Sequence, residues 1–435
     1  MNNTDNKTSN YSTLNKCRVC GSKELLTVLD LGEIYLSDFV DTSNSKKLFK
    51  APLELVLCNG DCKLVQLKHT VSNEFMYREY WYLSGINKTM INELRNIVDS
   101  IKDKIKLTSN DYVIDIGAND GTLLRHYEKK INTIGFEPAL NLKELNKNET
   151  TKIIPNFFNF EEWEKFYPNK KAKVVTAIGM FYDLDDPNTF VQDIVKCLHD
   201  NGLFIIQMMY LPLALERNAF DGICHEHLEY YSLSSLRFLL AKHDLIIDGL
   251  EIREHINEGS VRLFIKKTIN KNLKLKKSYK DTLNLYIDKE KKLGLNDINI
   301  YKKFALRIKS AKEQTVNFFK DEIKNGKIIH GYAASTKGNT TLQYYELNKN
   351  TIETISDRNP KKWGKLTAGS LIPVISEEQS RAKKPDYYFI LAWHFLNEFL
   401  HREEVFLANG GKFIVSMPSF KVIDAIEAKI ILNKK

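Results

Sequence analysis

This sequence of 435 residues has no long hydrophobic run. A helix needs about eighteen or more consecutive apolar residues to cross a bilayer, and no stretch of the chain meets that need. The first residues also have no apolar core of the kind found in secretory signal peptides. We therefore expect no membrane partner and a cytoplasmic location. Residues 1–13 are polar and rich in Asn, Ser and Thr, and we expect them to be disordered.

A basic patch interleaved with aromatic residues is also lacking. The formal net charge is +9, but the lysines concentrate between residues 270 and 325, where apolar residues recur at helical spacing. We interpret this stretch as a pair of solvated linking helices, in preference to a basic binding surface. Nucleic acid is therefore not expected as a partner. A chain of this length is too long for one core, so we expect two or three domains.

The chain has six cysteines, and four of them form two closely spaced pairs near the N-terminus. Paired cysteines in a reducing compartment are metal ligands more often than disulfides. Four thiolates fill the tetrahedral shell of zinc and leave no open position for chemistry, so the predicted zinc is structural. A metal-free remnant of such a site is the alternative. The predicted ligands are Cys17, Cys20, Cys58 and Cys62.

A glycine turn follows a short apolar run at residues 112–115. Gly117 and Gly121 let the backbone approach a ligand closely, and Asp115 ends the strand with a carboxylate. The segment after the turn, residues 122–130, has the pattern of a helix. A second strand ends at Glu137, where a carboxylate can accept hydrogen bonds from both ribose hydroxyls. The pattern therefore predicts a ligand that carries a ribose.

The glycine spacing distinguishes between two such ligands. A dinucleotide fingerprint would need glycine at Asn119 and at Thr122 as well. S-adenosylmethionine (SAM) has no pyrophosphate to bind, and the acid, two glycines and ribose acid fit it. A tight turn without a ligand is the alternative, but it does not explain acids at both strand ends.

Strands and helices alternate on both sides of this turn, from residue 73 to residue 268, as in a doubly wound parallel sheet. We expect a helix from about residue 140. Tyr80, Trp81 and Tyr82 precede the first strand and are either core packing or a lid over the cofactor. The predicted cofactor-binding residues are Tyr82, Asp115, Gly117, Asn119, Gly121, Glu137, Asn156, Phe157, Gly179 and Met180.

Titratable residues cluster a second time in an aromatic segment at residues 220–233. Cys224 is followed directly by His225, Glu226 and His227. Such groups are costly in apolar surroundings unless they are used, which favours proton handling. The segment lacks the H-E-x-x-H spacing of zinc hydrolases, and a third metal ligand is not apparent. Metal binding and a satisfied core histidine are the alternatives. Downstream, Arg262 is either a buried ion-pair partner or an anion clamp.

A second α/β unit is expected over residues 327–435. It begins with a strand, a turn of small residues and a helix. The turn is not an ATP-binding loop, because Thr336 stands where the second glycine of that motif belongs. A nucleotide or phosphate can still bind at the helix N-terminus beside Lys337.

The order of these parts resembles that of the three-domain sugar C-methyltransferases, which act on nucleotide-linked 4-keto deoxysugars. The resemblance runs from about Cys17 to Pro418 and rests on the four cysteines and on IDIGANDGTLL, CHEHLEYYSL, GSVRLF, GYAASTKGNT and LAWHF. It implies a zinc module (14–72), a SAM domain (73–268), a helical linker (269–326) and a Rossmann-like C-terminal domain (327–435) that contributes to the sugar-nucleotide site. The predicted substrate-binding residues are Tyr182, Arg262, Tyr332, Ser335, Lys337 and Asn339.

The resemblance also implies a mechanism. Relatives carry tyrosine where Cys224 stands here, whereas Glu226 and His227 match. One of these two is expected to remove the proton beside the ketone, and the other to orient it or to donate to the enolate. His225 is expected to pack or position. O- or N-methylation on the same scaffold is the nearest alternative, and a zinc-containing RNA methyltransferase is the alternative from another class. We expect a monomer or a homodimer.

Overall fold

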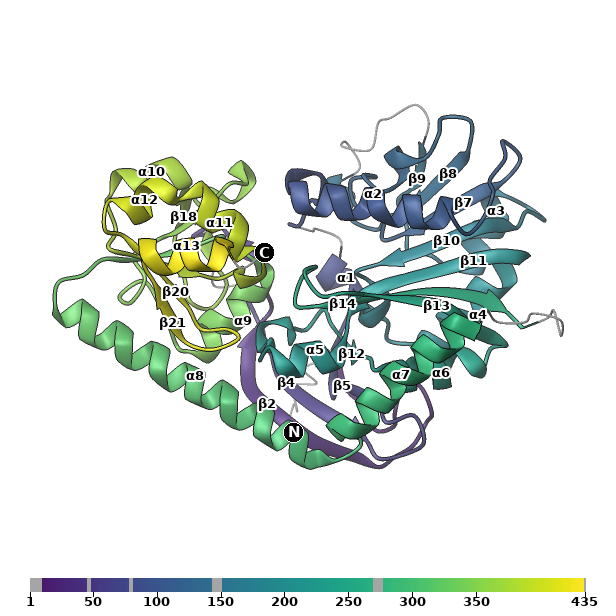
Figure 1. Ribbon diagram of the computed structural model, residues 1–435, viewed down its shortest axis with the longest axis horizontal. Coiled ribbons are helices and arrows are strands. Elements are labelled where there is room, and N and C mark those ends of the chain that lie inside the picture. The colour runs from purple at the N-terminus through teal and green to yellow at the C-terminus, as the bar shows by residue number, and fades with distance from the viewer. Residues whose placement is uncertain (1–9, 45–47, 78–80, 143–150, 269–276, 434–435) are drawn as a thin grey trace, which may run out of the picture.

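The computed structural model describes residues 10–44, 48–77, 81–142, 151–268 and 277–433. The N-terminal strands lie between two larger α/β units, with the central unit on one side and the C-terminal unit on the other (Figure 1). Tyr80, residues 1–9 and most of the helix expected from about residue 140 lie outside the described residues. The prediction of disorder up to residue 13 was wrong at its end, because Tyr11–Thr13 (β1) pairs with His69–Val71 (β6).

The N-terminal module is built on an antiparallel sheet of strand order β12-β5-β4-β2. Three of its strands come from the cysteine-containing region: Leu25–Tyr35 (β2), Lys50–Cys58 (β4) and Val65–Leu67 (β5). The fourth, Glu229–Tyr230 (β12), comes from the segment that follows the two histidines, and it pairs with β5. The zinc module and the histidine segment therefore share one sheet.

The central sheet has seven strands in the order β13-β14-β11-β10-β7-β8-β9. The five strands β11 to β9 are parallel, and β14 and β13 run antiparallel at one edge. This confirms the predicted doubly wound sheet. The bounds are Tyr112–Ile116 (β7), Asn132–Phe136 (β8), Thr151–Ile154 (β9), Ala172–Ile178 (β10), Leu198–Met209 (β11), Leu245–Arg253 (β13) and Ser260–Lys267 (β14).

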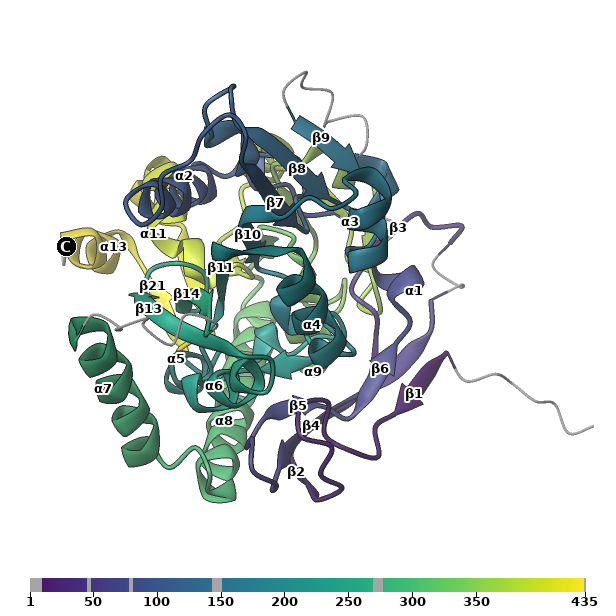
Figure 2. The ribbon, with the colours of Figure 1, turned by 90° about the vertical axis from the view of Figure 1, so that its right-hand side faces the viewer.

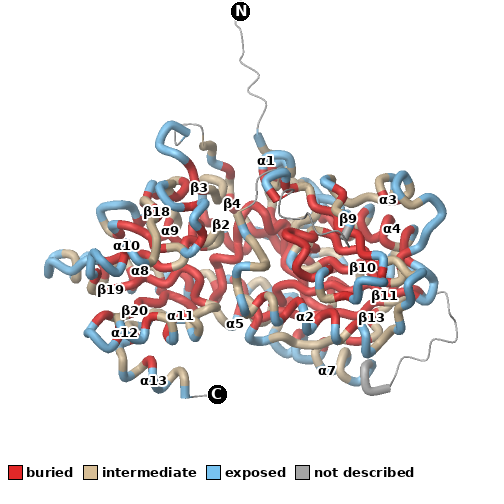
Figure 3. The backbone as a smooth tube through the Cα atoms, turned by 90° about the horizontal axis from the view of Figure 1, so that it is seen from above, coloured by how far each residue is buried: buried red, intermediate tan, exposed pale blue. Residues whose placement is uncertain are grey.

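Alternating side chains send each strand's apolar residues to two faces, and helices cover both. Lys88–Lys102 (α2) packs its buried face on one side, against Val113 and Ile205. Phe160–Phe166 (α3) and Pro187–Cys197 (α4) cover the other side (Figures 1 and 2). Burial follows the strands of both large sheets, while loops and outer helices are exposed (Figure 3).

The helix predicted after the glycine turn is only a 3-10 turn, Leu124–His126. The side chains of Asp120 and Thr122 hydrogen-bond to each other and to the local backbone, and such bonds compete with helix formation. The sheet face is also already covered by α2. Leu124 and its neighbours therefore fill the remaining gap without a regular helix.

The C-terminal unit is a six-stranded sheet of order β18-β16-β15-β19-β20-β21, which confirms a second Rossmann-like domain. Its strands are parallel except for the edge strand β21. Thr336–Tyr344 (α9) follows β15 directly. The other bounds are Ile329–Tyr332 (β15), Ile355–Asp357 (β16), Val374–Ser376 (β18), Tyr387–Ile390 (β19), Lys412–Val415 (β20), Lys421–Ile423 (β21), Glu377–Ala382 (α10), Leu396–Arg402 (α11) and Ala425–Asn433 (α13).

The predicted linking helices are Lys277–Leu293 (α7) and Ile298–Lys324 (α8). Each exposes one face, as expected, but neither is a free linker. Glu290 of α7 is buried and accepts hydrogen bonds from the Tyr210 hydroxyl and the Leu233 amide. The buried face of α8 includes Phe304 and Ile308. Among the described residues, no helix is long and apolar enough to cross a membrane.

Candidate active site

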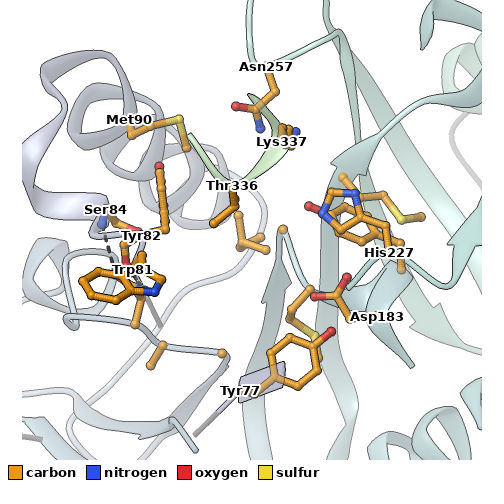
Figure 4. A pocket seen from close by; sticks show the side chains of 18 of the residues that line it. Tyr77, Trp81, Tyr82, Ser84, Met90, Asp183, His227, Asn257, Thr336 and Lys337 are labelled. Carbon is orange, nitrogen blue, oxygen red and sulfur yellow. Dashed lines mark hydrogen bonds between the residues drawn. The ribbon is translucent and has the colours of Figure 1, made fainter. Parts of the chain in front are cut away.

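One cavity of about 710 Å³ lies between the central and the C-terminal units. Its wall includes the glycine turn, the segment 81–87, His227 and the first residues of α9. Figure 4 shows Trp81, Tyr82, Asp183, His227 and Lys337 around the same open space. The central and the C-terminal units therefore both supply the wall of a single site.

Asp115 and Gly117 lie at the carboxyl end of β7, on the cavity wall. The Thr176 hydroxyl donates to Asp115 Oδ1 at 2.6 Å, which orients the carboxyl group. Burial raises the pKa of Asp115 to about 7. Gly117 has a φ of +69°, and a Cβ there would come within 3.1 Å of Met180 Cγ. The turn thus needs glycine both for its backbone conformation and for space.

Glu137 ends β8 beside this turn. The backbone amides of Asn119 and Ala139 donate to its two oxygens, at 2.7 Å and 2.8 Å. Burial raises the pKa of Glu137, while the two amide hydrogen bonds lower it. Each carboxylate oxygen keeps a further lone pair, so the group is held in place to accept two hydroxyl donors.

The segment 82–86 is tied to the glycine turn. Asn119 Oδ1 accepts from the Ser84 amide and its Nδ2 donates to the Tyr82 carbonyl, both at 3.0 Å. Asp120 Oδ2 accepts from the Gly85 amide at 2.8 Å. Trp81 donates from Nε1 to Asp38 Oδ1 at 2.7 Å. Trp81 and Tyr82 both line the cavity, so this segment forms part of its wall and is not buried core.

Most of the other predicted cofactor residues lie on the wall as well. Phe157, Gly179 and Met180 line the cavity. Gly121 does not; its φ of +74° turns the chain behind the wall. Asn156 is also off the wall, where its Oδ1 accepts from the Phe157 amide at 2.9 Å.

His227 is the member of the histidine segment that reaches the cavity. Its Nδ1 lies 2.7 Å from the Gly222 carbonyl oxygen, which can only accept, so Nδ1 carries the proton and Nε2 has a free lone pair. The Tyr182 ring, also on the wall, lies 4.3 Å away, centroid to centroid. Burial, with the charge of Lys337, lowers the pKa of His227 to about 3. The imidazole is neutral at neutral pH.

The neighbouring residues point elsewhere. Glu226 is buried and does not line the cavity; burial raises the pKa of its carboxyl group. His225 Nε2 lies 3.0 Å from the Ala51 carbonyl oxygen in the zinc module. Cys224 is buried behind the wall. The structure therefore does not bring Glu226, His227 and His225 together at the cavity.

The C-terminal wall begins at Ala333, whose φ of +66° is unusual for a residue other than glycine. This bend directs residues 333–337 into the cavity. Ser335 caps α9 by accepting from the Gly338 amide at 2.9 Å. Lys337 Nζ lies 2.6 Å from Glu258 Oε1 of the central unit.

Three predicted substrate residues lie outside the wall. Arg262 is fully buried in ion pairs with Glu93 and Glu251, at 2.7 Å and 2.8 Å. Arg262 is therefore a buried ion-pair partner and not an anion clamp. Tyr332 donates to Glu403 Oε1 at 2.8 Å within the C-terminal core. Asn339 donates to the Asp38 carbonyl at 3.1 Å and joins the first and last domains.

Several wall residues were not predicted from the sequence. The signal for most of them is a position just after a strand or in a short turn, where parallel sheets bind ligands, whereas Arg402 ends the helix α11. They include Asp183, Asn257, Arg358, His394 and Arg402.

The four predicted metal ligands converge, with all their Sγ atoms within 4.8 Å of one another. Cys17 Sγ lies 3.4 Å from that of Cys62, and Cys20 Sγ lies 3.4 Å from that of Cys58. A closed set of four thiols matches structural zinc and leaves no position for a substrate.

Comparison with protein families matches three consecutive parts of the chain. Residues 17–77 match a zinc binding domain, residues 86–248 a methyltransferase domain, and residues 255–418 a C-methyltransferase C-terminal domain. Together with the doubly wound sheet, the matches define a class I SAM-dependent methyltransferase. Its cofactors are SAM and a structural zinc ion.

The relationship extends along nearly the whole chain. The C-methyltransferase NovU of Streptomyces niveus is 30% identical over 418 residues, which cover 95% of this chain and 97% of that protein. The chain therefore belongs to the family of three-domain SAM-dependent C-methyltransferases.

Two solved structures match part of the chain at low similarity. A SAM-dependent methyltransferase from Clostridium acetobutylicum is 13% identical, with a TM-score of 0.32, over 40% of this chain and 89% of its own. A complex of the Haloferax volcanii Trm112 activator with a methyltransferase is 14% identical, with a TM-score of 0.34, over 42% of this chain and 94% of its own.

Proposed function

We propose that this C-methyltransferase acts on a nucleotide-linked keto deoxysugar and methylates the carbon beside its ketone. The observation that carries this proposal is that Glu137, His227 and Lys337, from two domains, border one cavity. A SAM-type turn, a neutral imidazole and a cationic wall thus face the same space. The domain boundaries at 72/73, 268/269 and 326/327 are part of this proposal.

SAM, when bound, supplies an electrophilic methyl group. In our proposal Glu137 holds its ribose hydroxyls, and Asp115 and Gly117 hold its amino-acid end. The geometry supports this because Glu137 and Asp115 end neighbouring parallel strands, β8 and β7. The wall segment with Tyr82 then limits access of water.

We assign the base to Nε2 of His227. The nitrogen is unprotonated, and Tyr182 packs against the ring. A neutral imidazole can accept a proton, and negative charge that develops on the substrate raises the pKa of a neighbouring imidazole during the reaction. Glu226 and His225 are assigned to positioning, since neither lines the cavity.

The nucleotide is placed against the C-terminal wall, where Arg358, Lys362 and Arg402 line the cavity. Guanidinium groups suit a diphosphate, because they donate several hydrogen bonds in one plane. Arg358 is about half-exposed and pairs only loosely with Glu398, at 3.5 Å. Ser335, which caps α9, lines the cavity as well.

The test is a panel of nucleotide-linked sugars, with and without a keto group, incubated with SAM. We expect a product heavier by one methyl group only with keto sugars, and a carbon-bound methyl signal by NMR. An oxygen-bound methyl signal would identify O-methylation instead. Methylation of an oligonucleotide but of no sugar would overturn the proposal.

A further inference from the structure

A buried ion pair closes one side of the cavity. Lys337 of the C-terminal unit and Glu258 of the central unit are 2.6 Å apart, Nζ to Oε1. The Glu258 side chain is fully buried, whereas 18% of the Lys337 side chain is exposed, and it lines the cavity. An ammonium group has three donors. The described contact with Glu258 uses one of them, so others can reach a ligand.

We propose that Lys337 is a catalytic residue whose ammonium group binds the ketone oxygen of the substrate and stabilises the enolate that forms there. This inference rests on the proposed function. It assigns Lys337 to the reacting end of the sugar, beyond a general part in substrate binding.

The position of Lys337 fits this role because its charge reaches the candidate base. Lys337 and His227 both line the cavity, and the charge of Lys337 contributes to the lowered pKa of His227. The side chains of Lys337 and His227 lie around the same open space in Figure 4. A substrate between them would have its acidic carbon near His227 and its ketone oxygen near Lys337.

The surrounding charges keep Lys337 protonated. Although burial opposes it, the charges of Glu258 and Asp221 raise the pKa of Lys337. Lys337 in turn lowers the pKa of Glu258 to about 2, so this pair is ionised. Burial raises the pKa of Asp183 well above its ordinary value, so this neighbouring acid is neutral and does not cancel the ammonium charge.

The backbone adds to the same field. Lys337 is in the first turn of α9, whose N-terminus carries partial positive charge toward the cavity. The strained conformation at Ala333 brings that turn to the wall. A side chain and a helix end from one short segment thus act on the same oxygen.

The movement of electrons in the reaction explains why Lys337 should affect kcat more than KM. His227 takes the proton from the carbon beside the ketone, the C–H electron pair forms the C=C bond, and the carbonyl π pair moves to oxygen. That oxygen becomes negative beside the Lys337 ammonium. The enolate carbon then takes the methyl group, and the C–S pair stays on sulfur. Because the charge is absent from the bound ketone, Lys337 stabilises the transition state more than the ground state.

The test uses Lys337→Met in the full-length enzyme with a keto sugar that the wild type methylates. We expect kcat to fall by about 10²–10³, which is the loss typical of one oxyanion donor. The KM for the acceptor and the affinity for S-adenosylhomocysteine (SAH), the product of SAM, should stay within about threefold of wild type. Deuterium uptake at the acceptor carbon, measured with SAH in D2O, should fall by the same factor. Exposed Lys349→Met is the matched control and should behave as wild type.

Removing Lys337 leaves the buried Glu258 carboxylate without its ammonium partner, with only His394 Nδ1 at 3.7 Å, which can unfold the protein. Lys337→Met/Glu258→Gln removes both charges and should refold while keeping the kinetic loss. A variant that raises KM at unchanged kcat, or one that exchanges deuterium at the wild-type rate, would overturn the role of Lys337. If the wild-type enzyme neither exchanges deuterium into any keto sugar nor methylates one, the proposed function itself fails, and the role of Lys337 fails with it.

Discussion

The backbone amide of Leu67 donates a hydrogen bond to the carbonyl of Leu228 at 2.8 Å. Leu67 belongs to the zinc module, and Leu228 directly follows His227. The contact continues the pairing of β5 with β12. Asn188 of α4 ties the module to the central unit as well, because its side-chain amide donates to the carbonyl of Arg18 at 2.8 Å. The metal module therefore holds the segment that carries the candidate base.

This link leads to a prediction about zinc. Purified protein should contain one zinc ion per chain, and Cys58→Ala should lose it. Because a closed thiolate site contributes folding energy, the N-terminal module should then melt. Methylation should fall with it, since β12 loses its partner strand, while SAH affinity should change little. Metal analysis, thermal melting and kinetics check this.

Cys197→Ala is the matched control, because Cys197 is a buried thiol outside the cluster. It should keep its zinc. A zinc-free protein with wild-type activity would contradict the structural coupling.

The ribose contact can be tested at Glu137. Glu137→Gln removes the charge but can still accept a backbone hydrogen bond. We expect SAH binding to weaken by about 1.5–3 kcal/mol, the range for a hydrogen bond to a charged group. Calorimetry measures the effect, with exposed Glu128→Gln as control. Unchanged SAH affinity would place the ribose elsewhere.

Asp115 predicts a pH dependence of cofactor binding. With a pKa of about 7, it is mostly protonated below neutral pH and charged above it. A ligand ammonium group binds the charged form, so it must displace the proton at low pH. The Kd for SAH should therefore rise up to about tenfold per pH unit below 7 and level off above it.

Asp115→Asn should bind SAH weakly at every pH and lose this dependence. Calorimetry at several pH values in buffers of different ionisation enthalpy would also detect the released proton. A flat profile in the wild type would contradict the ammonium contact.

The base is tested at His227. His227→Asn keeps a hydrogen bond to Gly222 but has no basic nitrogen, and we expect kcat to fall by about 10²–10⁴ with SAH binding intact. Deuterium exchange into the acceptor should stop. Glu226→Gln, off the wall, should lose less. If the order of the two variants is reversed, the proton goes to Glu226 instead.

Much of this protein could be predicted from sequence because its signals are local. The strand, glycine turn and acid at Asp115, Gly117 and Glu137 depend on short-range chemistry, and so do the two cysteine pairs. The second Rossmann-like unit was predictable from apolar strands alternating with helical segments. The helix expected over residues 122–130 does not form, because α2, from earlier in the chain, already covers that face of the sheet.

Only the tertiary structure decided which side chains meet. Residues 225–227 are consecutive, yet His227 reaches the cavity while His225 contacts Ala51 and Glu226 stays behind the wall. The sequence allowed Arg262 to be either an ion-pair partner or an anion clamp, and only the structure shows that Glu93, far away in sequence, is its partner. Lys337 lies in α9 of the C-terminal unit and Glu258 lies just before β14 of the central sheet, yet the two side chains form an ion pair. Sequence patterns report which backbone a segment prefers, but the direction and partners of a buried charge depend on elements that pack against it from elsewhere in the chain.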